Sequence, residues 1–127
     1  EKLADQISTT ENELRKTLFG NDRFVEILLA EFNAEIVGQA LFFKNFSTFI
    51  GKPGIYLEDL YVKPEMRGKG IGKALLDKII SIAKERNYGR VEWPVLDWNE
   101  SAIDFYKKIG AKSLDDWTIF RLTSDKF

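Results

Sequence analysis

Apolar and polar positions alternate along the chain in patterns that predict a series of helices and strands. Thr10 and Glu13 have the spacing of a capping box, so a helix is predicted to begin there. Leu14 and Leu18 fall on one face of this helix, and Gly20 is a typical stop signal. The first predicted element is therefore a short amphipathic helix.

Three strands are predicted next. The runs 24–32 and 36–46 are rich in aliphatic and aromatic residues, which favours two strands joined by a tight turn at 33–34. A third run at 55–62 has the same character, and Pro64 should end it. The segment therefore predicts a hairpin followed by one more strand.

A second helix follows a glycine-rich loop and precedes a short strand. Its apolar positions recur at helical spacing: Ile71, Ala74, Leu75, Ile79, Ile82 and Ala83. Residues 91–96 predict a short strand that contains Pro94. Because proline cannot donate a backbone hydrogen bond, this strand fits best where neighbouring strands diverge.

The last two predicted elements are a helix and a strand. Asn99 or Ser101 is a candidate cap for a helix that runs to Gly110, and residues 117–122 predict a final strand. A hairpin followed by strand, helix and strand predicts a mixed sheet with helices packed on it, an α/β fold. The length of 127 residues predicts one domain over 1–127.

The chain has no His and no Cys, which limits the catalytic and metal-binding groups that it can offer. Disulfides, thiolate nucleophiles, histidine bases and Cys/His zinc sites are thereby excluded, and no metal site is expected. Acid–base chemistry must come from carboxylates, Tyr or Lys. A cytoplasmic location is the default expectation without a disulfide framework, and no apolar run predicts a membrane span.

Charge is unevenly distributed along the chain. The formal net charge is −1, which argues against general nucleic-acid binding. Residues 63–90 carry eight Lys/Arg and three Asp/Glu, a charge of +5, which leaves −6 on the remainder. By itself this division favours two solvated faces, but it also suits a basic segment that meets an anion.

The loop at 67–72 reads R-G-K-G-I-G and lies between a predicted strand and a predicted helix. Alternate glycines allow close approach of a ligand, and a helix N-terminus offers unpaired N–H groups to an anion. The loop matches neither the P-loop nor the dinucleotide-binding fingerprint, because the spacing differs. A phosphate site is favoured over a glycine-rich turn without a ligand.

This loop resembles the R/Q-x-x-G-x-G/A motif of the GNAT N-acetyltransferases. The flanking segments Y-L-E-D-L-Y-V at 56–62 and V-L-D-W-N at 95–99, with Phe105 and Tyr106, resemble the diamine (spermidine/spermine) and thialysine acetyltransferase branch. The resemblance implies a GNAT-like fold with diverging central strands flanked by helices. Relatives begin with a strand and a helix before the segment that opens this chain, so the chain is expected to lack the N-terminal strand and most of the first helix.

The resemblance also implies acetyl-CoA as cofactor and a set of residues that bind it. The main chain of Leu60 and Val62 would pair with the pantetheine arm, and the loop amides would bind the pyrophosphate. The implied cofactor residues are Leu60, Val62, Arg67, Gly68, Lys69, Gly70, Gly72, Lys73 and Asn99.

The implied catalytic residues are Tyr106, the general acid that protonates the CoA thiolate, and Glu58, the base that acts through water. A phenol suits this role, because its ordinary pKa of about 10 is close to the roughly 8.5 of a thiol. Tyr106 is alternatively a core residue with a satisfied hydroxyl. Asp59 is the second candidate base; since neighbouring strand residues face opposite ways, only one of the two carboxylates is expected to face the acetyl group.

The predicted function is direct transfer of an acetyl group to a primary amine of a small molecule, either a polyamine or a thialysine- or lysine-like amine. Glu58, Asp59, Asp97 and Trp98 are the expected acceptor residues, although Trp98 fits a core position equally well. The alternatives are a non-catalytic acyl-CoA-binding module and a protein or peptide N-acetyltransferase. Family resemblance further implies a homodimer, with neither nucleic acid nor membrane as partner.

Overall fold

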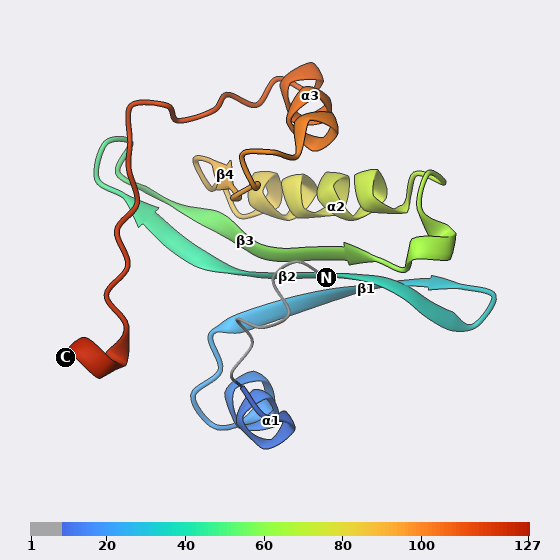
Figure 1. Cartoon of the computed structure of the whole chain (residues 1–127), viewed down its shortest axis with the longest axis horizontal. Helices are drawn as coiled ribbons and strands as arrows, with labels where there is room; N and C mark the ends of the chain where they lie inside the picture. The colour runs from blue at the N-terminus through green and yellow to red at the C-terminus, as the bar shows by residue number, and fades with distance from the viewer. Residues whose placement is uncertain (1–8) are drawn as a thin grey trace. The chain divides into compact units, whose positions relative to one another are not determined.

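The computed structural model describes residues 9–127, which form two compact units divided between Pro94 and Val95. Figure 1 shows the elements of both units. The first unit contains α1 (Glu11–Phe19), β1 (Val25–Phe32), β2 (Glu35–Ser47), β3 (Lys52–Val62), the 3₁₀ turn η2 (Pro64–Met66), α2 (Ile71–Glu85) and β4 (Val91–Glu92). The second contains α3 (Glu100–Lys108) and the 3₁₀ turn η3 (Ser124–Lys126).

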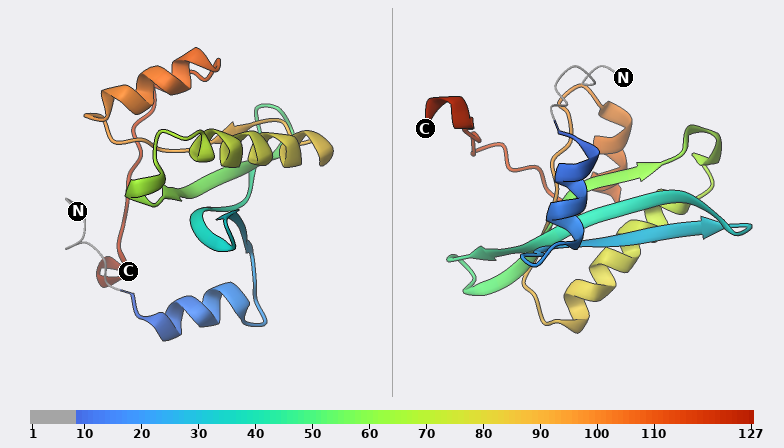
Figure 2. Two further views of the ribbon diagram at one scale, coloured as in Figure 1. Left: turned by 90° about the vertical axis from the view of Figure 1, so that its right-hand side faces the viewer. Right: turned by 90° about the horizontal axis from the view of Figure 1, so that it is seen from below.

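The first unit is built on a mixed four-stranded sheet in the order β1-β2-β3-β4. Strands β1, β2 and β3 pair antiparallel, whereas β4 pairs parallel to β3. Helices α1 and α2 lie on opposite faces of this sheet (Figures 1 and 2). The predicted α/β fold with a mixed sheet flanked by helices is confirmed.

Local sequence signals explain how the first elements begin and end. The Thr10 hydroxyl accepts a hydrogen bond from the Glu13 amide at 3.2 Å, so the predicted helix cap is confirmed. Asn33 and Ala34 join β1 to β2 with φ angles of 53° and 64°. Positive φ at both central residues is the geometry of a two-residue hairpin turn, because it matches the twist of the flanking strands.

Helix α2 and the strands β2 and β3 together provide the hydrophobic core of the first unit. The buried side chains of α2 pack against the faces of β2 and β3 that turn toward it. The core consists of Val37, Ala40, Phe42, Ile55, Leu57, Leu75, Leu76, Ile79 and Ala83. Gly38 lies under the start of this helix, since a Cβ there would lie 3.4 Å from side-chain atoms of Ile71 and Leu75. The helical periodicity therefore identified Leu75, Ile79 and Ala83 correctly, but it missed the buried Leu76, and Ala74 is exposed.

The fourth strand is shorter than the sequence predicted. Residues 91–96 were expected to form a strand, but β4 ends at Glu92, two residues before Pro94. It pairs with Ile55 and Tyr56 alone. Because Pro94 has no N–H to donate, the ladder cannot continue through it. The pairing between β3 and β4 therefore ends at Tyr56, and the expected divergence of two central strands stays a prediction.

The second unit differs from the prediction at its end. Asn99 caps α3 by accepting a hydrogen bond from the Ala102 amide at 3.4 Å, as expected. The strand predicted at 117–122 is absent from the structure, and its large apolar side chains are exposed. A strand needs a hydrogen-bonded neighbour, and the described part of this unit contains no other strand.

Two expectations stay predictions. The expected absence of a strand and most of a helix at the N-terminus concerns positions outside the described residues. The single domain over 1–127 is likewise a prediction. No helix within residues 9–127 is long and apolar enough to cross a membrane.

The packing of α2 makes a prediction about stability. Ile79 is fully buried, whereas Ile80 next to it is 42% exposed. Ile79→Ala should lower the free energy of unfolding by about 2–5 kcal/mol, because it leaves a cavity in the core. Ile80→Ala should lower it by less than about 1 kcal/mol. Urea unfolding of both variants measures the difference, and equal losses would show that α2 does not pack as described.

Candidate acetyl-CoA and acceptor site

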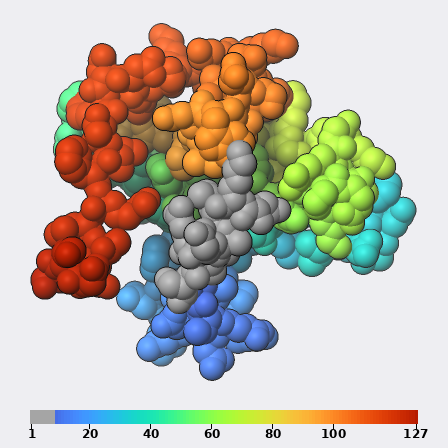
Figure 3. Space-filling view, in the orientation of Figure 1, coloured from blue at the N-terminus to red at the C-terminus, as the bar shows by residue number. Residues whose placement is uncertain are grey.

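The glycine segment lies where the sequence placed it, between β3 and α2. Gly68 and Gly70 have φ angles of 80° and 85°, in the left-handed region that favours glycine. A Cβ at either position would meet no heavy atom within 4 Å among the described residues, so the loop leaves open space beside its backbone. The segment stands at the molecular surface, in yellow-green, in Figure 3.

The first turn of α2 is open to an anion. Gly70 is the N-cap, and within the described chain no side chain caps it. The first hydrogen bond of the helix runs from the Ala74 amide to the Gly70 carbonyl at 3.0 Å. The amides of the residues between them have no partner in the helix, and they carry the positive end of its dipole. These groups can bind a phosphate.

The cations around this turn are held in different ways. The Arg67 Nε donates to the Val62 carbonyl at 2.8 Å, and its guanidinium lies 5.5 Å from the centre of the Tyr61 ring. Lys73 forms an exposed ion pair with Asp77 at 2.8 Å. Lys69 lies in the loop itself and is exposed. Arg67 therefore links the loop to the end of β3 by a hydrogen bond, while Lys69 and Lys73 contribute positive charge to the turn.

The main-chain groups of Leu60 and Val62 lie on the edge of β3 beyond its last pair with β4. Lys63 donates to the Val37 carbonyl at 2.9 Å, and antiparallel pairs alternate between bonded and non-bonded. By this alternation, the register puts the main-chain groups of Leu60 and Val62 on the side away from β2. Since β4 pairs no further than Tyr56, this edge carries no strand within the unit that ends at Pro94. It is an edge to which an extended ligand can hydrogen-bond.

A β-bulge places the two candidate carboxylates of β3. Leu57 pairs with Phe42 and Asp59 with Leu41, so Glu58 is the extra residue. Both carboxylates are exposed. The bulge interrupts the regular alternation on which the expected opposite orientation of Glu58 and Asp59 rested, so that orientation stays a prediction.

The two carboxylates differ in their surroundings. Asp59 accepts a hydrogen bond from the Gln39 Nε2 on β2 at 3.3 Å. Glu58 lies near the Tyr56 hydroxyl, whose pKa is raised by burial first and then by the charges of Glu58 and Glu92. Bulges are typical of functional sites, where they redirect a side chain.

The remaining predicted site residues belong to the second unit. Asp97 and Trp98 precede α3, and Trp98 is 58% exposed, which excludes the core position considered for it. The Asn99 Oδ1 is engaged as the helix cap. Tyr106 is half-buried, with its ring 5.7 Å from that of Phe105. Burial raises the pKa of Tyr106 above its ordinary value, so the phenol holds its proton more firmly.

Glu92 was not identified from the sequence. It is the partner of Tyr56 in the parallel register, so both side chains lie on the same face of the sheet. The Asn45 Nδ2 donates to the Glu92 Oε1 at 3.4 Å. The only signal in the sequence was a single Glu in a short apolar run, which does not indicate its neighbours. The strand pairing alone places it here.

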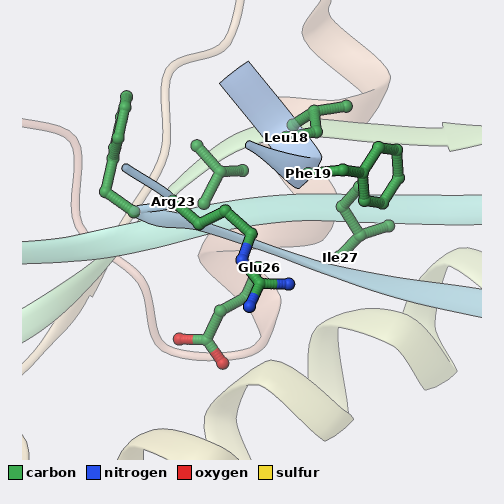
Figure 4. Close-up of a pocket in the computed structure, with 7 residues that line it drawn as sticks. Leu18, Phe19, Arg23, Glu26 and Ile27 are labelled. Atoms are coloured by element: carbon green, nitrogen blue, oxygen red, sulfur yellow. The ribbon is translucent and has the colours of Figure 1, made fainter. Parts of the chain in front are cut away.

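A hollow of about 500 Å³ lies elsewhere, between the end of α1 and the start of β1. Figure 4 shows Leu18, Phe19 and Ile27 around it, together with Arg23 and Glu26. None of the predicted site residues lines it. Glu26 is held by Arg86 through two hydrogen bonds of 2.8 Å, which lower the pKa of its carboxyl. The described residues contain no group of three or more Asp or Glu arranged to hold a metal ion.

Comparison with known proteins identifies the family. The sequence profile of the Acetyltransferase (GNAT) family matches residues 3–111. The chain is 38% identical over 136 aligned positions to a thialysine N-epsilon-acetyltransferase from Bos taurus, which covers 98% of this chain and 79% of that protein. It is 43% identical over 90 positions to an L-ornithine N5-acetyltransferase from Arabidopsis thaliana, covering 71% of this chain and 40% of that protein.

Among solved structures, an integron cassette protein from the mobile metagenome of V. cholerae has a TM-score of 0.83 with 26% identity. The match covers 98% of this chain and 80% of that one. The profile match spans most of the chain, and it includes the glycine turn, the bulged strand and α3. The chain therefore belongs to the GNAT family of acetyltransferases.

Proposed function

We propose that this protein transfers an acetyl group from acetyl-CoA directly to a terminal primary amine of a small basic molecule. One observation carries the proposal: the uncapped first turn of α2, the uncovered edge of β3 and the bulged Glu58 belong to one strand–turn–helix segment. The thialysine and ornithine acetyltransferases to which the chain is similar support a small amine as acceptor.

The residues of this segment fit acetyl-CoA. We assign its pyrophosphate to the amides of the turn at 68–73, with Lys69 and Lys73 contributing positive charge. The Leu60 main chain and the Val62 amide would pair with the pantetheine arm, since the Val62 carbonyl already accepts from Arg67. Asn99 stays a cofactor residue by family resemblance. When bound, acetyl-CoA supplies an activated acetyl group as a thioester.

Two proton transfers complete the reaction, and we assign them to Glu58 and Tyr106. An amine with a pKa of about 10 is protonated at neutral pH and cannot attack the thioester carbonyl. Glu58 would accept that proton through water, the amine nitrogen would bond to the carbonyl carbon, and the carbon–sulfur bond would break. Tyr106 would then donate its proton to the CoA thiolate. Support for Tyr106 comes from its burial, which keeps the phenol protonated.

Asp59, Asp97 and Trp98 are proposed acceptor contacts on the same grounds of resemblance. A homodimer and a cytoplasmic location stay predictions, as does a polyamine acceptor. Binding of CoA without acetyl transfer to any amine would instead indicate the non-catalytic module.

The glycine turn gives a test that separates binding from folding. Among the described residues, a Cβ at Gly72 would come within 4 Å of the Val62 Cγ2 alone, at 3.7 Å. Gly72→Ala should keep or raise the free energy of unfolding, because alanine favours a helix by about 0.5–1 kcal/mol. The same Cβ would stand beside the amides that hold the phosphates, so the affinity for CoA should fall at least about tenfold in calorimetry. Unchanged affinity would contradict the assignment of the turn.

Tyr106→Phe tests the general acid. The kcat for acetyl transfer should fall about 100-fold or more, while the Kd for CoA stays nearly constant, because the ring is kept and only the proton donor is lost. Release of the CoA thiol measures kcat, and calorimetry measures Kd. Tyr88→Phe, on a tyrosine outside the proposed site, is the matched control. An unchanged kcat would exclude Tyr106 from this role.

The pH dependence of kcat provides an independent check. Because burial raises the pKa of Tyr106 above its ordinary 10.0, the phenol stays mostly protonated up to about pH 10. Deprotonation of Tyr106 should therefore lower kcat only above about pH 10. The Tyr106→Phe variant should not show this decrease. A decline centred well below pH 10 that Tyr106→Phe abolishes would contradict the assignment.

A further inference from the structure

The side chain of Arg67, at the start of the glycine turn, points back to the strand that precedes it. Its Nε donates to the Val62 carbonyl, five residues earlier in the chain, at 2.8 Å. Its guanidinium lies 5.5 Å from the centre of the Tyr61 ring. This one side chain is therefore held at two points on β3, by a charge-assisted hydrogen bond and by a cation–π contact.

The backbone of Arg67 is held by the 3₁₀ turn η2, which lies between β3 and α2 (Figure 1). The Arg67 amide donates to the Pro64 carbonyl at 3.3 Å, and the Met66 amide donates to the Lys63 carbonyl at 2.9 Å. The Lys63 amide in turn donates to the Val37 carbonyl on β2 at 2.9 Å. Arg67 is therefore tied to the sheet through its backbone as well as through its side chain.

The residues that follow have few contacts of their own to order them. Gly68 and Gly70 have positive φ angles, and a Cβ at either would meet no heavy atom within 4 Å among the described residues. Glycine loses more backbone freedom on ordering than any other residue, so such a turn is best ordered by fixing its two ends. The Ala74 amide fixes the far end by donating to the Gly70 carbonyl at 3.0 Å. Arg67 fixes the near end.

The hydrogen bond from Arg67 also limits the open edge of β3. The main-chain groups of Leu60 and Val62 lie on this edge, beyond the last pair with β4. Because the Val62 carbonyl already accepts from Arg67, an extended ligand can pair as far as the Val62 amide and no further. Such a ligand leaves the strand where the chain leads into the glycine turn.

We propose that Arg67 is a positioning residue for the cofactor and that Tyr61 acts together with it. The Arg67 Nε–H holds the turn amides in the arrangement that binds the pyrophosphate, while Lys69 and Lys73 supply the positive charge. This inference rests on the proposed function, and it separates the group that shapes the turn from the groups that attract the phosphates. Family resemblance made Arg67 a cofactor residue; on this inference its hydrogen bond, and not its charge, is what the cofactor needs.

Positioning and charge predict different dependences on salt. When a turn is only sometimes in its binding arrangement, the apparent Kd rises by the inverse of that fraction, whatever the ionic strength. An exposed cation that attracts a phosphate is screened instead, since the Debye length falls from about 10 Å at 0.1 M salt to about 3 Å at 1 M. Binding at high salt therefore isolates the contribution of position.

Two substitutions of Arg67 separate its hydrogen bond from its charge. Glutamine has an N–H the same number of bonds from the backbone as the arginine Nε but no charge, whereas lysine keeps the charge and has a methylene at that place. In calorimetry of the full-length protein with CoA at about 0.5 M salt, Arg67→Lys should raise Kd about tenfold, the effect of losing a hydrogen bond from a charged group. Arg67→Gln should stay within about threefold of the native protein.

Steady-state rates and unfolding show whether the effect is confined to the cofactor. Arg67→Lys should raise KM for acetyl-CoA and leave kcat and the KM for the amine nearly unchanged. Because Arg67 is exposed, the midpoint of urea unfolding should change little in either variant.

Two controls calibrate the measurement. Lys69→Gln removes a charge from the turn, so it should raise Kd for CoA more at about 0.05 M than at about 0.5 M salt. Arg23→Gln, at an exposed position outside the proposed site, should change Kd at neither salt concentration.

Tyr61→Leu tests the second contact of the guanidinium. It should raise Kd for CoA about two- to fivefold, which corresponds to an exposed cation–π contact. Combined with Arg67→Ala it should cause no further loss, because its effect passes through Arg67. A loss that persists in the Arg67→Ala protein would overturn the part assigned to Tyr61.

Three results for Arg67 would overturn the inference and leave acetyl transfer intact. Affinity kept by Arg67→Lys and lost by Arg67→Gln would show that the charge binds the phosphates. Equal losses would show that the whole guanidinium contacts the cofactor, and unchanged affinity in both variants would show that Arg67 serves the fold alone. A native protein that binds no CoA would instead overturn the proposed function.

Discussion

The packing of α2 on β2 and β3 is the contact on which the rest of the first unit depends. Phe42 and Ile55 from the sheet and Leu76 and Ile79 from the helix are the largest fully buried side chains. Because this core fixes α2 along its length, the first turn of the helix is held at the end of β3. The glycine turn can then remain open, since its geometry is set by the two elements that it joins.

The candidate site is built where the sheet departs from regular pairing. A regular β3 would use all of its backbone groups for β2 and β4 and would alternate its side chains strictly. The bulge at Glu58 interrupts the alternation, and the end of β4 before Pro94 leaves the edge of β3 uncovered. The same irregularities thus supply a backbone edge for a ligand and a carboxylate beside it.

Much of the fold follows from signals that act over short distances. The cap at Thr10, the turn at Asn33 and the buried face of α2 depend on residues within a few positions of each other, so the sequence predicts them well. The prediction of a strand at 117–122 was wrong because a strand depends on residues that are distant in the sequence. Its apolar character is local, but pairing in a sheet requires a partner that no local pattern supplies.

For the candidate site, too, the sequence predicted some features and the folded structure alone determined others. The sequence by itself determined the glycine turn, the family resemblance and the restriction of acid–base chemistry to carboxylates, Tyr and Lys, because these follow from residue types and their spacing. The tertiary structure decided that Glu58 is a bulge residue, that Arg67 bonds to Val62, and that Glu92 lies beside Tyr56. Register between strands depends on contacts between residues up to 36 positions apart, such as Ile55 and Val91, and only the folded chain brings such residues together.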